Sequence, residues 1–429
     1  MLILAAGLLQ AGPYDWHALP FGGAGFVCGV ITCPSQKGVI FARTDVGGAY
    51  RWNPQDQSWT QLLDWVAENE KGYLGVESLA VDPSAPKRVY LLAGTAYWDH
   101  GKSAILRSED SGATFEVIDT TAQFKAHGNG MGRQNGERLA VDPHNGKILL
   151  VGTRRDGMFR SSDYGRTWAA VASFPVKTTG NDNGICFVLF DPRSGQKGQA
   201  TPVIYAGVST KGQNVFISKD AGKTWQPIPG LPADLMPQRA SLASDGTLYL
   251  TYGSEAGPWN TQKGGVWKLD TRTLKSVAIT PAGYETRPFG GITVSAGDPK
   301  RIACSTINTW LDQRRIRGQV LSQHERRRNM AGSRREKGQR GSALAHPGLR
   351  DPLGRLHRVR SVRSPGAIRH VRQRRLPDEE HGLRSDLDFH SRRPRGNRAS
   401  RHGLPRGRAS PDSRRGLRRV LVHEHLRLR

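Results

Sequence analysis

Cysteine is scarce in this chain of 429 residues, which contains only Cys28, Cys33, Cys186 and Cys304. So few cysteines exclude a disulfide scaffold for a protein of this length, and none of them shows the CxxC spacing that is typical of a zinc site. Cys28 and Cys33 are close enough in sequence to pair in an oxidising compartment, but we expect buried free thiols. The sequence predicts neither a bound metal nor a cofactor.

Tryptophan and tyrosine are absent from the last 119 residues, 311–429. All ten Trp and all ten Tyr lie before residue 311, and Phe389 is the only Phe after it. The same segment carries 32 Arg and one Lys against 11 Asp and Glu, and such a composition cannot bury a normal core. We therefore expect residues 311–429 to form a disordered tail. Residues 1–310 hold 30 basic and 26 acidic side chains, so they offer no basic face for nucleic acid.

Long apolar runs are also rare, and the clearest one is LILAAGLLQA at residues 2–11. It resembles the apolar region of a signal peptide, although no basic residues precede it. We expect residues 1–11 to be a signal-peptide remnant and the protein to be a secreted or periplasmic monomer. No other stretch is long enough to span a membrane as a helix.

Three octapeptides repeat along the chain: SEDSGATF at residues 108–115, SSDYGRTW at 161–168 and SKDAGKTW at 218–225. All fit S-x-D-x-G-x-T-[WF], and Asp110, Asp163 and Asp220 are 53 and 57 residues apart. An Asp side chain can bind backbone N–H groups of its own turn, and Gly supplies the positive φ of a hairpin. We therefore interpret these Asp boxes as structural rather than catalytic.

A second motif repeats in step with the Asp boxes. LAVDP ends at residues 83 and 143 and VLFDP at residue 192, each before a further apolar strand, and Asp298-Pro299 begins a fourth copy. Strand, Asp-Pro turn, strand, Asp box and strand make one four-stranded antiparallel sheet, and a period of about 50 residues is typical of a propeller. We predict an all-β, seven-bladed Asp-box β-propeller over residues 12–310, of which about five blades are in frame.

The Arg-rich tail has the composition of a coding sequence that is read in the wrong frame. Back-translation of residues 322–331 allows a shift by one base that yields RSTNGGATW, which is another Asp box with Asn in place of Asp. Further segments of the tail yield apolar and aromatic strand sequence in the same shifted register, including GDYDGF near Arg418. The slip would lie between about Leu311 and Val320. The alternative is a genuine Arg-rich extension that binds nucleic acid.

Residues 21–52, FGGAGFVCGVITCPSQKGVIFARTDVGGAYRW, resemble the opening of glycoside hydrolase family 74, and so do NGERLAVDP at 135–143 and GGITVSAGDP at 290–299. This resemblance implies two seven-bladed propellers that face each other across an open cleft. It also implies cleavage of β-1,4-glucan backbones, most often xyloglucan, with inversion at the anomeric carbon. The partner that it implies is therefore a polysaccharide substrate.

The same resemblance assigns the catalytic residues. Inverting hydrolysis needs one ionised carboxylate to activate water and one protonated carboxylic acid to assist the leaving oxygen. Asp45 in RTDVGGAY matches the general base of the family, and Gly47 and Gly48 would let a sugar approach the backbone. The general acid matches an Asp of the shifted GDYDGF, which is absent from this chain. We therefore expect the chain as it stands to be inactive.

Two further groups of side chains are candidates for the site. Exposed aromatic rings would stack on sugar faces, with packing between blades as the alternative for each: Tyr50, Trp52, Trp98 and Trp310. The remaining carboxylates near the motifs are expected to lie in solvated loops or caps: Asp64, Glu77, Asp99 and Glu137.

Two other functions are consistent with an Asp-box propeller. An exo-sialidase needs an Arg triad for the sialate carboxylate, for which Arg133, Arg138 and Arg154 are candidates, but its F-R-I-P segment is missing. A non-catalytic propeller that binds a glycan or a protein is the natural function of a chain that is interrupted before its second propeller.

Overall fold

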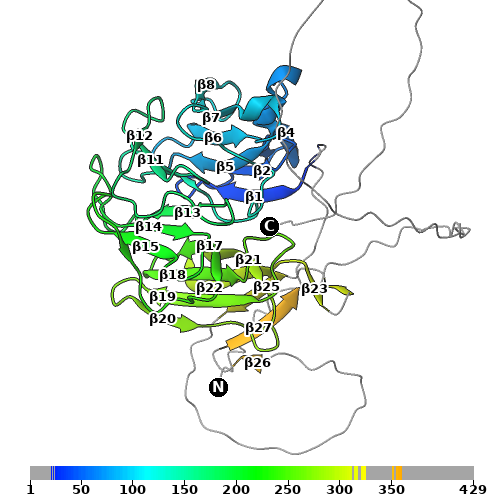
Figure 1. Cartoon of the computed structure of the whole chain (residues 1–429), viewed down its shortest axis with the longest axis vertical. Helices are drawn as coiled ribbons and strands as arrows, with labels where there is room; N and C mark the ends of the chain where they lie inside the picture. Colours follow the sequence, from blue (N-terminus) through cyan, green and yellow to red (C-terminus); the bar gives the residue numbers. More distant parts are fainter. Residues whose placement is uncertain are drawn as a thin grey trace, which may run out of the picture. The chain divides into compact units, whose positions relative to one another are not determined.

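The computed structural model describes residues 21, 23, 25–311, 314–316, 320–324, 350–351 and 354–359. The expected signal-peptide remnant at 1–11 and most of the expected tail lie outside these residues. The described part consists of β-strands and two short 3-10 helices, η1 (Glu68–Leu74) and η2 (Asp99–Gly101) (Figure 1).

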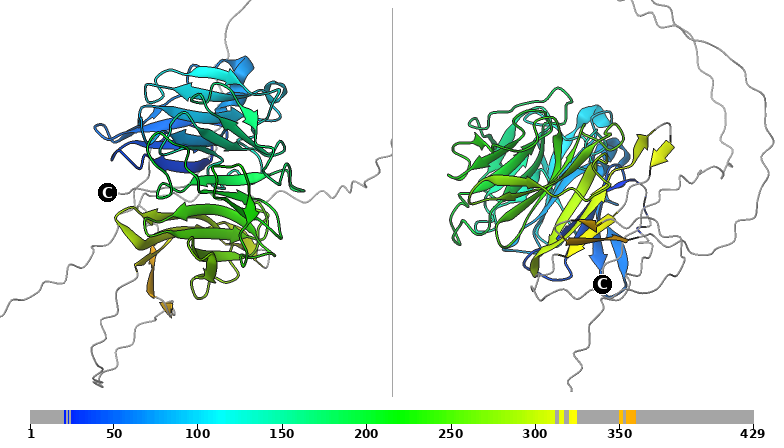
Figure 2. Two further views of the ribbon diagram at one scale, coloured as in Figure 1. Left: turned by 90° about the vertical axis from the view of Figure 1, so that its left-hand side faces the viewer. Right: turned by 90° about the horizontal axis from the view of Figure 1, so that it is seen from below.

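Six antiparallel sheets follow one another along the chain, and Figure 2 shows them from two further sides. The first sheet contains β1 (Val27–Thr32), β2 (Ile40–Thr44), β3 (Ala49–Asn53) and β4 (Ser58–Gln61). The second contains β5 (Val76–Val81), β6 (Val89–Gly94), β7 (Ser103–Ser108) and β8 (Glu116–Asp119). The third contains β9 (Leu139–Val141), β10 (Leu149–Gly152), β11 (Met158–Ser161) and β12 (Ala169–Ala170). The fourth contains β13 (Ile185–Phe190), β14 (Ile204–Val208), β15 (Val215–Ser218) and β16 (Gln226–Pro227). The fifth contains β17 (Met236–Leu242), β18 (Thr247–Gly253), β19 (Gly264–Asp270) and β20 (Lys275–Ala278).

The sixth sheet is formed by β21 (Phe289–Ser295), β22 (Asp298–Thr306), β25 (Val320–His324), β27 (Gly354–Val359) and β26 (Arg350–Asp351). A separate hairpin pairs β23 (Thr309–Leu311) with β24 (Arg314–Ile316). The described part therefore has six blades, whereas about five were expected. The expected number was too low because the fifth sheet, β17–β20, carries neither an Asp-Pro turn nor an Asp box.

Strands also occur beyond Leu311, where we expected a disordered tail. β25 pairs with β22 through five residues, and Leu321 is buried against Ile302 and Cys304 in the core of the sixth blade. A strand needs only backbone partners and an apolar side chain that faces the core, and Leu321 supplies that side chain.

The order of the strands within each blade sets a gradient of burial. In the second blade, every residue of β5, β6 and β7 is buried, whereas β8 is largely exposed. The first strands of successive blades contact one another, as in the pairs β5–β9, β9–β13, β13–β17 and β17–β21. The first strand of each blade is thus the innermost, and β13 (ICFVLF) accordingly consists almost entirely of buried apolar residues.

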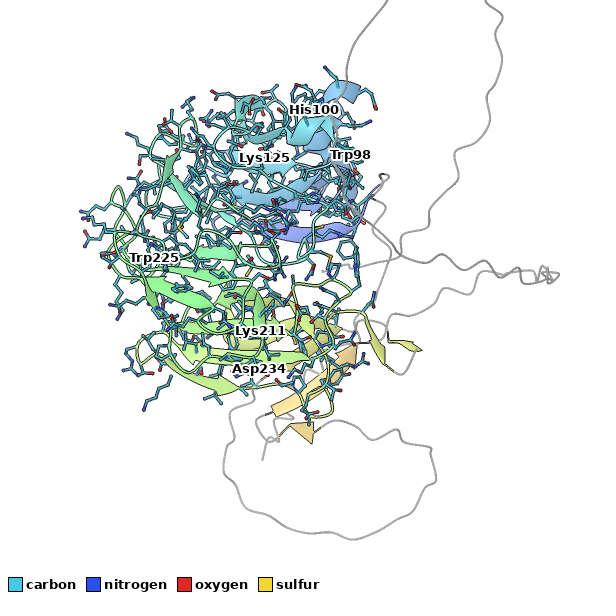
Figure 3. All side chains as sticks on the ribbon, in the orientation of Figure 1. Trp98, His100, Lys125, Lys211, Trp225 and Asp234 are labelled. Carbon is cyan, nitrogen blue, oxygen red and sulfur yellow. The ribbon has the colours of Figure 1, made fainter. Side chains whose placement is uncertain are left out.

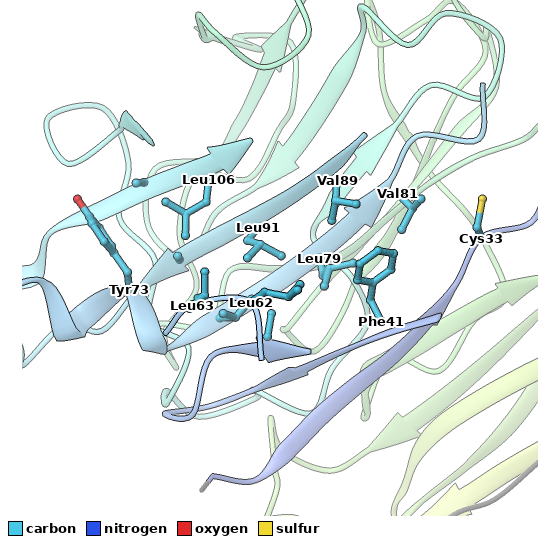
Figure 4. Packing of buried hydrophobic residues seen from close by; sticks show 14 residues of the cluster. Cys33, Phe41, Leu62, Leu63, Tyr73, Leu79, Val81, Val89, Leu91 and Leu106 are labelled. Carbon is cyan, nitrogen blue, oxygen red and sulfur yellow. The ribbon is translucent and has the colours of Figure 1, made fainter. Parts of the chain in front are cut away.

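Apolar side chains fill the space between neighbouring blades. Between the first two blades, Phe41 packs with Leu79, Val89, Leu91 and Leu106, which are buried almost completely (Figure 4). The four cysteines are buried and free, so Cys28 and Cys33 form no disulfide. Burial raises the pKa of Cys28 to about 12.

The Asp boxes form the turns between the third and fourth strands, and each conserved position has a partner. Asp110 accepts hydrogen bonds from the backbone N and the Oγ1 of Thr114 at 2.9 and 2.7 Å, and Ser108 Oγ donates to Asp110 Oδ1. Gly112 adopts a φ of 85°. Asp163 and Asp220 repeat these contacts with their own Ser and Thr, so all three carboxylates bond within their own turns.

Candidate functional site

Asp45 and the Asp boxes lie at opposite ends of the strands. Neighbouring strands run in opposite directions, so turns between second and third strands emerge at one end and turns between third and fourth strands at the other. Asp45 belongs to the β2–β3 turn, whereas the Asp boxes follow the third strands. We call the end that carries the β2–β3 turn the Asp45 face. The Asp-box carboxylates therefore take no part in this face.

The turn that carries Asp45 is fixed by hydrogen bonds within residues 44–48. Thr44 donates its N–H and its hydroxyl to Gly48 O, at 3.0 and 2.9 Å, and Gly47 N–H donates to Thr44 Oγ1 at 2.8 Å. Gly48 has a φ of 81°, which L side chains rarely adopt. Both glycines thus serve the turn itself, and their contact with a sugar stays a prediction.

Asp45 is only 5% exposed, and both of its carboxylate oxygens have partners. Phe26 N–H donates to Oδ1 at 2.7 Å, and Arg133 Nε lies 3.0 Å from Oδ2. Phe26 donates a hydrogen bond and Arg133 brings a positive charge, which are contacts that a carboxylate makes.

Arg133 connects Asp45 to an exposed aromatic ring. Its guanidinium lies over the ring of Trp259, with 4.4 Å between Cζ and the ring centroid, and 5.7 Å from the ring of Phe26. Trp259 is 53% exposed. Sequence analysis proposed Arg133 only for a sialidase triad and did not propose Trp259, because the two residues are far apart in the chain.

The segment that carries Arg133 lies against the start of β5 and against the loop between β18 and β19. A Cβ on Gly128 would lie 2.4 Å from the carbonyl carbon of Gly75, so only glycine allows this approach. Further along, Gly132 N–H donates to Gly257 O at 2.8 Å, and Gln134 Nε2 donates to Ala256 O at 2.7 Å. These contacts hold the loop of Trp259 against the Asp45 turn.

Glu77 and Glu137 are enclosed by arginines, which corrects their expected place in solvated loops or caps. Glu77 is 2% exposed and lies 3.1 Å from Arg138 Nε and 2.5 Å from Arg154 Nε. Glu137 accepts two hydrogen bonds from Nε of the buried Arg43, at 2.9 and 3.0 Å. The other two carboxylates agree with the expectation: Asp64 is exposed, and Asp99 accepts the N–H of Gly72.

The charges around Glu77 determine its protonation state. Burial alone would raise the pKa of this carboxyl, but Arg154, Arg138 and the N–H of His127 lower its pKa to about 2. Arg138 and Arg154 form ion pairs with Glu77, and Arg133 forms an ion pair with Asp45. The three arginines therefore do not form a free triad for a sialate carboxylate.

The aromatic candidates lie in different environments. Tyr50 is 2% exposed and packs edge-on against Phe21, which is not the exposed position expected for sugar stacking. Trp52 packs against Trp59 in the same sheet. Trp98 is partly buried at the start of η2 and is near His100, well apart from Trp225 (Figure 3). The side chain of Trp310 lies outside the described residues.

The described residues contain no group of three or more His, Cys, Asp or Glu that would hold a metal ion. No helix within the same residues is long and apolar enough to cross a membrane.

Comparisons with known proteins agree with the repeats and the fold. The model of the BNR/Asp-box repeat family matches residues 216–227. A xyloglucanase of a Paenibacillus species is 44% identical over 316 residues, which cover 70% of this chain and 31% of that protein. A xyloglucanase of Acetivibrio thermocellus is 42% identical over 317 residues, which cover 70% of this chain and 37% of that protein. The solved Niastella koreensis GH74 enzyme has a TM-score of 0.66 at 45% identity, covering 72% of this chain and 45% of that one.

The six blades and the Asp boxes define a β-propeller of the Asp-box class. The chain belongs to glycoside hydrolase family 74, the family of the xyloglucanases that it resembles over about 70% of its length. It spans between about a third and two fifths of the length of the curated relatives that it matches.

Proposed function

We propose that this chain carries the general base of an inverting hydrolase of β-1,4-glucans such as xyloglucan, and that Asp45 is this base. The observation that supports the proposal is the Asp45 carboxylate, which two donors hold on the face opposite the Asp boxes. A general base must be ionised to take a proton from the attacking water. Xyloglucan is the substrate that the names of the relatives indicate, and a secreted location suits a polysaccharide substrate.

Inversion also needs a protonated carboxylic acid about 6.5–9.5 Å from the base. Glu77 does not suit this role, because its pKa of about 2 keeps it ionised at neutral pH. We assign the acid to a second propeller, to which the shifted GDYDGF segment would belong. The chain as it stands would then bind the glucan without cleaving it.

The test begins with sequencing of the gene across the codons for residues 310–322, followed by expression of the chain in both frames. We expect the frame-restored protein to release reducing ends from xyloglucan with inverted anomeric configuration. Replacing Asp45 with Asn should lower the rate by about 10²–10⁴-fold, because the water loses its base. Asp64→Asn is the matched control, since Asp64 is an exposed carboxylate near the same blade.

Two results would reject this proposal. If Asp45→Asn hydrolyses xyloglucan as fast as Asp64→Asn, Asp45 is not the base. If the restored protein neither binds nor cleaves β-1,4-glucans, the substrate is wrong.

A further inference from the structure

Trp259 is unusual among the large apolar side chains that the described residues expose. Six such side chains are exposed, and the ring of Trp259 is the one that packs on a residue bound to Asp45. Trp65, which is 43% exposed, instead lies near Phe115 of the first Asp box. An exposed Trp beside a candidate catalytic carboxylate needs an explanation other than core packing.

Trp259 combines a contact on its ring with a large exposed fraction. The guanidinium of Arg133 covers one face, and a cation in this position is attracted to the π-system and orients the ring. The residue is 53% exposed, so much of its surface is accessible to a ligand. The ion pair and the ring contact together place the ring centre within about 9 Å of the Asp45 carboxylate.

The loop that holds Trp259 is organised before any ligand binds. Gly257 donates its N–H to Asn260 Oδ1 at 2.9 Å, and Gly132 and Gln134 fix the backbone of the loop from the other side. A ring that is already oriented loses little conformational entropy when a ligand stacks on it. Sugars present an apolar C–H face, which matches a flat, uncharged ring surface.

We propose that Trp259 is a substrate-binding residue, the stacking platform for the sugar ring that lies next to the bond attacked from Asp45. This inference rests on the proposed function, because it assumes a β-glucan on the Asp45 face. Arg133 then has two contacts that matter for the substrate: it binds the carboxylate with Nε and supports the platform with its guanidinium plane. Trp259 thereby fixes which sugar ring is aligned with Asp45.

The test is binding of xyloglucan oligosaccharides to the full chain, measured by calorimetry for wild type, Trp259→Ala, Trp259→Phe and Trp65→Ala. We expect Trp259→Ala to weaken Kd by about tenfold, since a stacked aromatic contact contributes that much. Trp259→Phe should retain most of the affinity and lose the ligand-induced change in Trp fluorescence. Trp65→Ala should bind as wild type, and thermal unfolding of each variant shows whether the fold is kept.

The outcomes separate this inference from the proposed function. If wild type binds the oligosaccharide and Trp259→Ala binds equally well, Trp259 is not a platform, while the proposed function stands. If wild type binds no β-glucan, both are rejected. If Trp259→Ala does not fold, Trp259→Phe decides, because a ligand-induced fluorescence change of undiminished amplitude in this variant also overturns the inference.

Discussion

Replacing Glu77 with Gln removes one negative charge from between two buried arginines. The pKa of about 2, compared with an ordinary 4.5, corresponds to about 3 kcal/mol in favour of the folded state at neutral pH. Removal of one partner of a buried ion pair costs about 3–5 kcal/mol, because the other charge is left without compensation. Both arguments give the same range, so we expect Glu77→Gln to lower the free energy of unfolding by about 3–5 kcal/mol at pH 7.

Glu116→Gln is the matched control for this prediction. Glu116 also lies near two arginines, Arg107 and Arg166, but its side chain is 46% exposed. Exposed ion pairs contribute only about 0–1 kcal/mol. Urea unfolding, followed by Trp fluorescence, measures both variants against wild type. If the two variants are equally stable, the buried charge cluster does not have the energy that we assign to it.

The pH dependence gives the same experiment a second readout. The pKa of Glu77 is lowered on folding, so the unfolded chain binds more protons between about pH 2 and 4.5. The contribution of Glu77 is therefore complete above about pH 4.5 and is lost as the pH falls towards 2. The stability difference between wild type and Glu77→Gln should shrink to less than half at pH 3. A difference that stays constant from pH 7 to pH 3 would contradict ionisation of Glu77 as its cause.

The remaining predictions concern the Asp boxes and the cysteines. Asp163→Ala should lower the free energy of unfolding by about 1–2 kcal/mol, because the turn loses its bonds to Ser161 and Thr167. Glucan binding should be unchanged. Weaker glucan binding without a loss of stability would give Asp163 a role in the site. Cys186 and Cys304 have a pKa of about 12 because of burial, so a thiol reagent at pH 8 should label them only after unfolding. Rapid labelling of the native protein would refute this.

The sequence predicted the blades well because the turn chemistry is local. The Ser, Asp and Thr of S-x-D-x-G-x-T-[WF] bond one another within a few residues, as Asp110 does with Ser108 and Thr114. A local motif that recurs at a fixed period also fixes the order of strands. The expected number of blades was too low because the sheet of β17–β20 carries neither an Asp box nor an Asp-Pro turn, so no local motif marks it.

The surroundings of the site were less predictable because they depend on contacts between distant residues. Glu77 precedes Arg154 by 77 residues, and Arg133 precedes Trp259 by 126. Each lies in a segment whose own pattern indicates only a strand or a loop. The resemblance to the family supplied Asp45, but neither a motif nor a period indicated which arginine would meet it.

A comparison of Asp45 with Glu77 shows why two buried carboxylates that bind arginine differ in function. Glu77 is surrounded by Arg138, Arg154 and the N–H of His127. Its donors come from several sides, and it is 2% exposed, so little room is left for a water molecule. Such a group stabilises the fold.

Asp45 has one arginine and one backbone N–H. It lies in a turn at the end of its strand, and its arginine supports a ring that is half exposed. A carboxylate oxygen has more than one lone pair to offer, so an ionised Asp45 keeps acceptor capacity that these two donors do not use. Acceptor capacity on an ionised group at the end of a blade is what a base needs to bind and activate water. Position separates the catalytic candidate from the structural carboxylate, because Asp45 lies in a turn beside a half-exposed ring whereas Glu77 lies within β5 between two buried arginines.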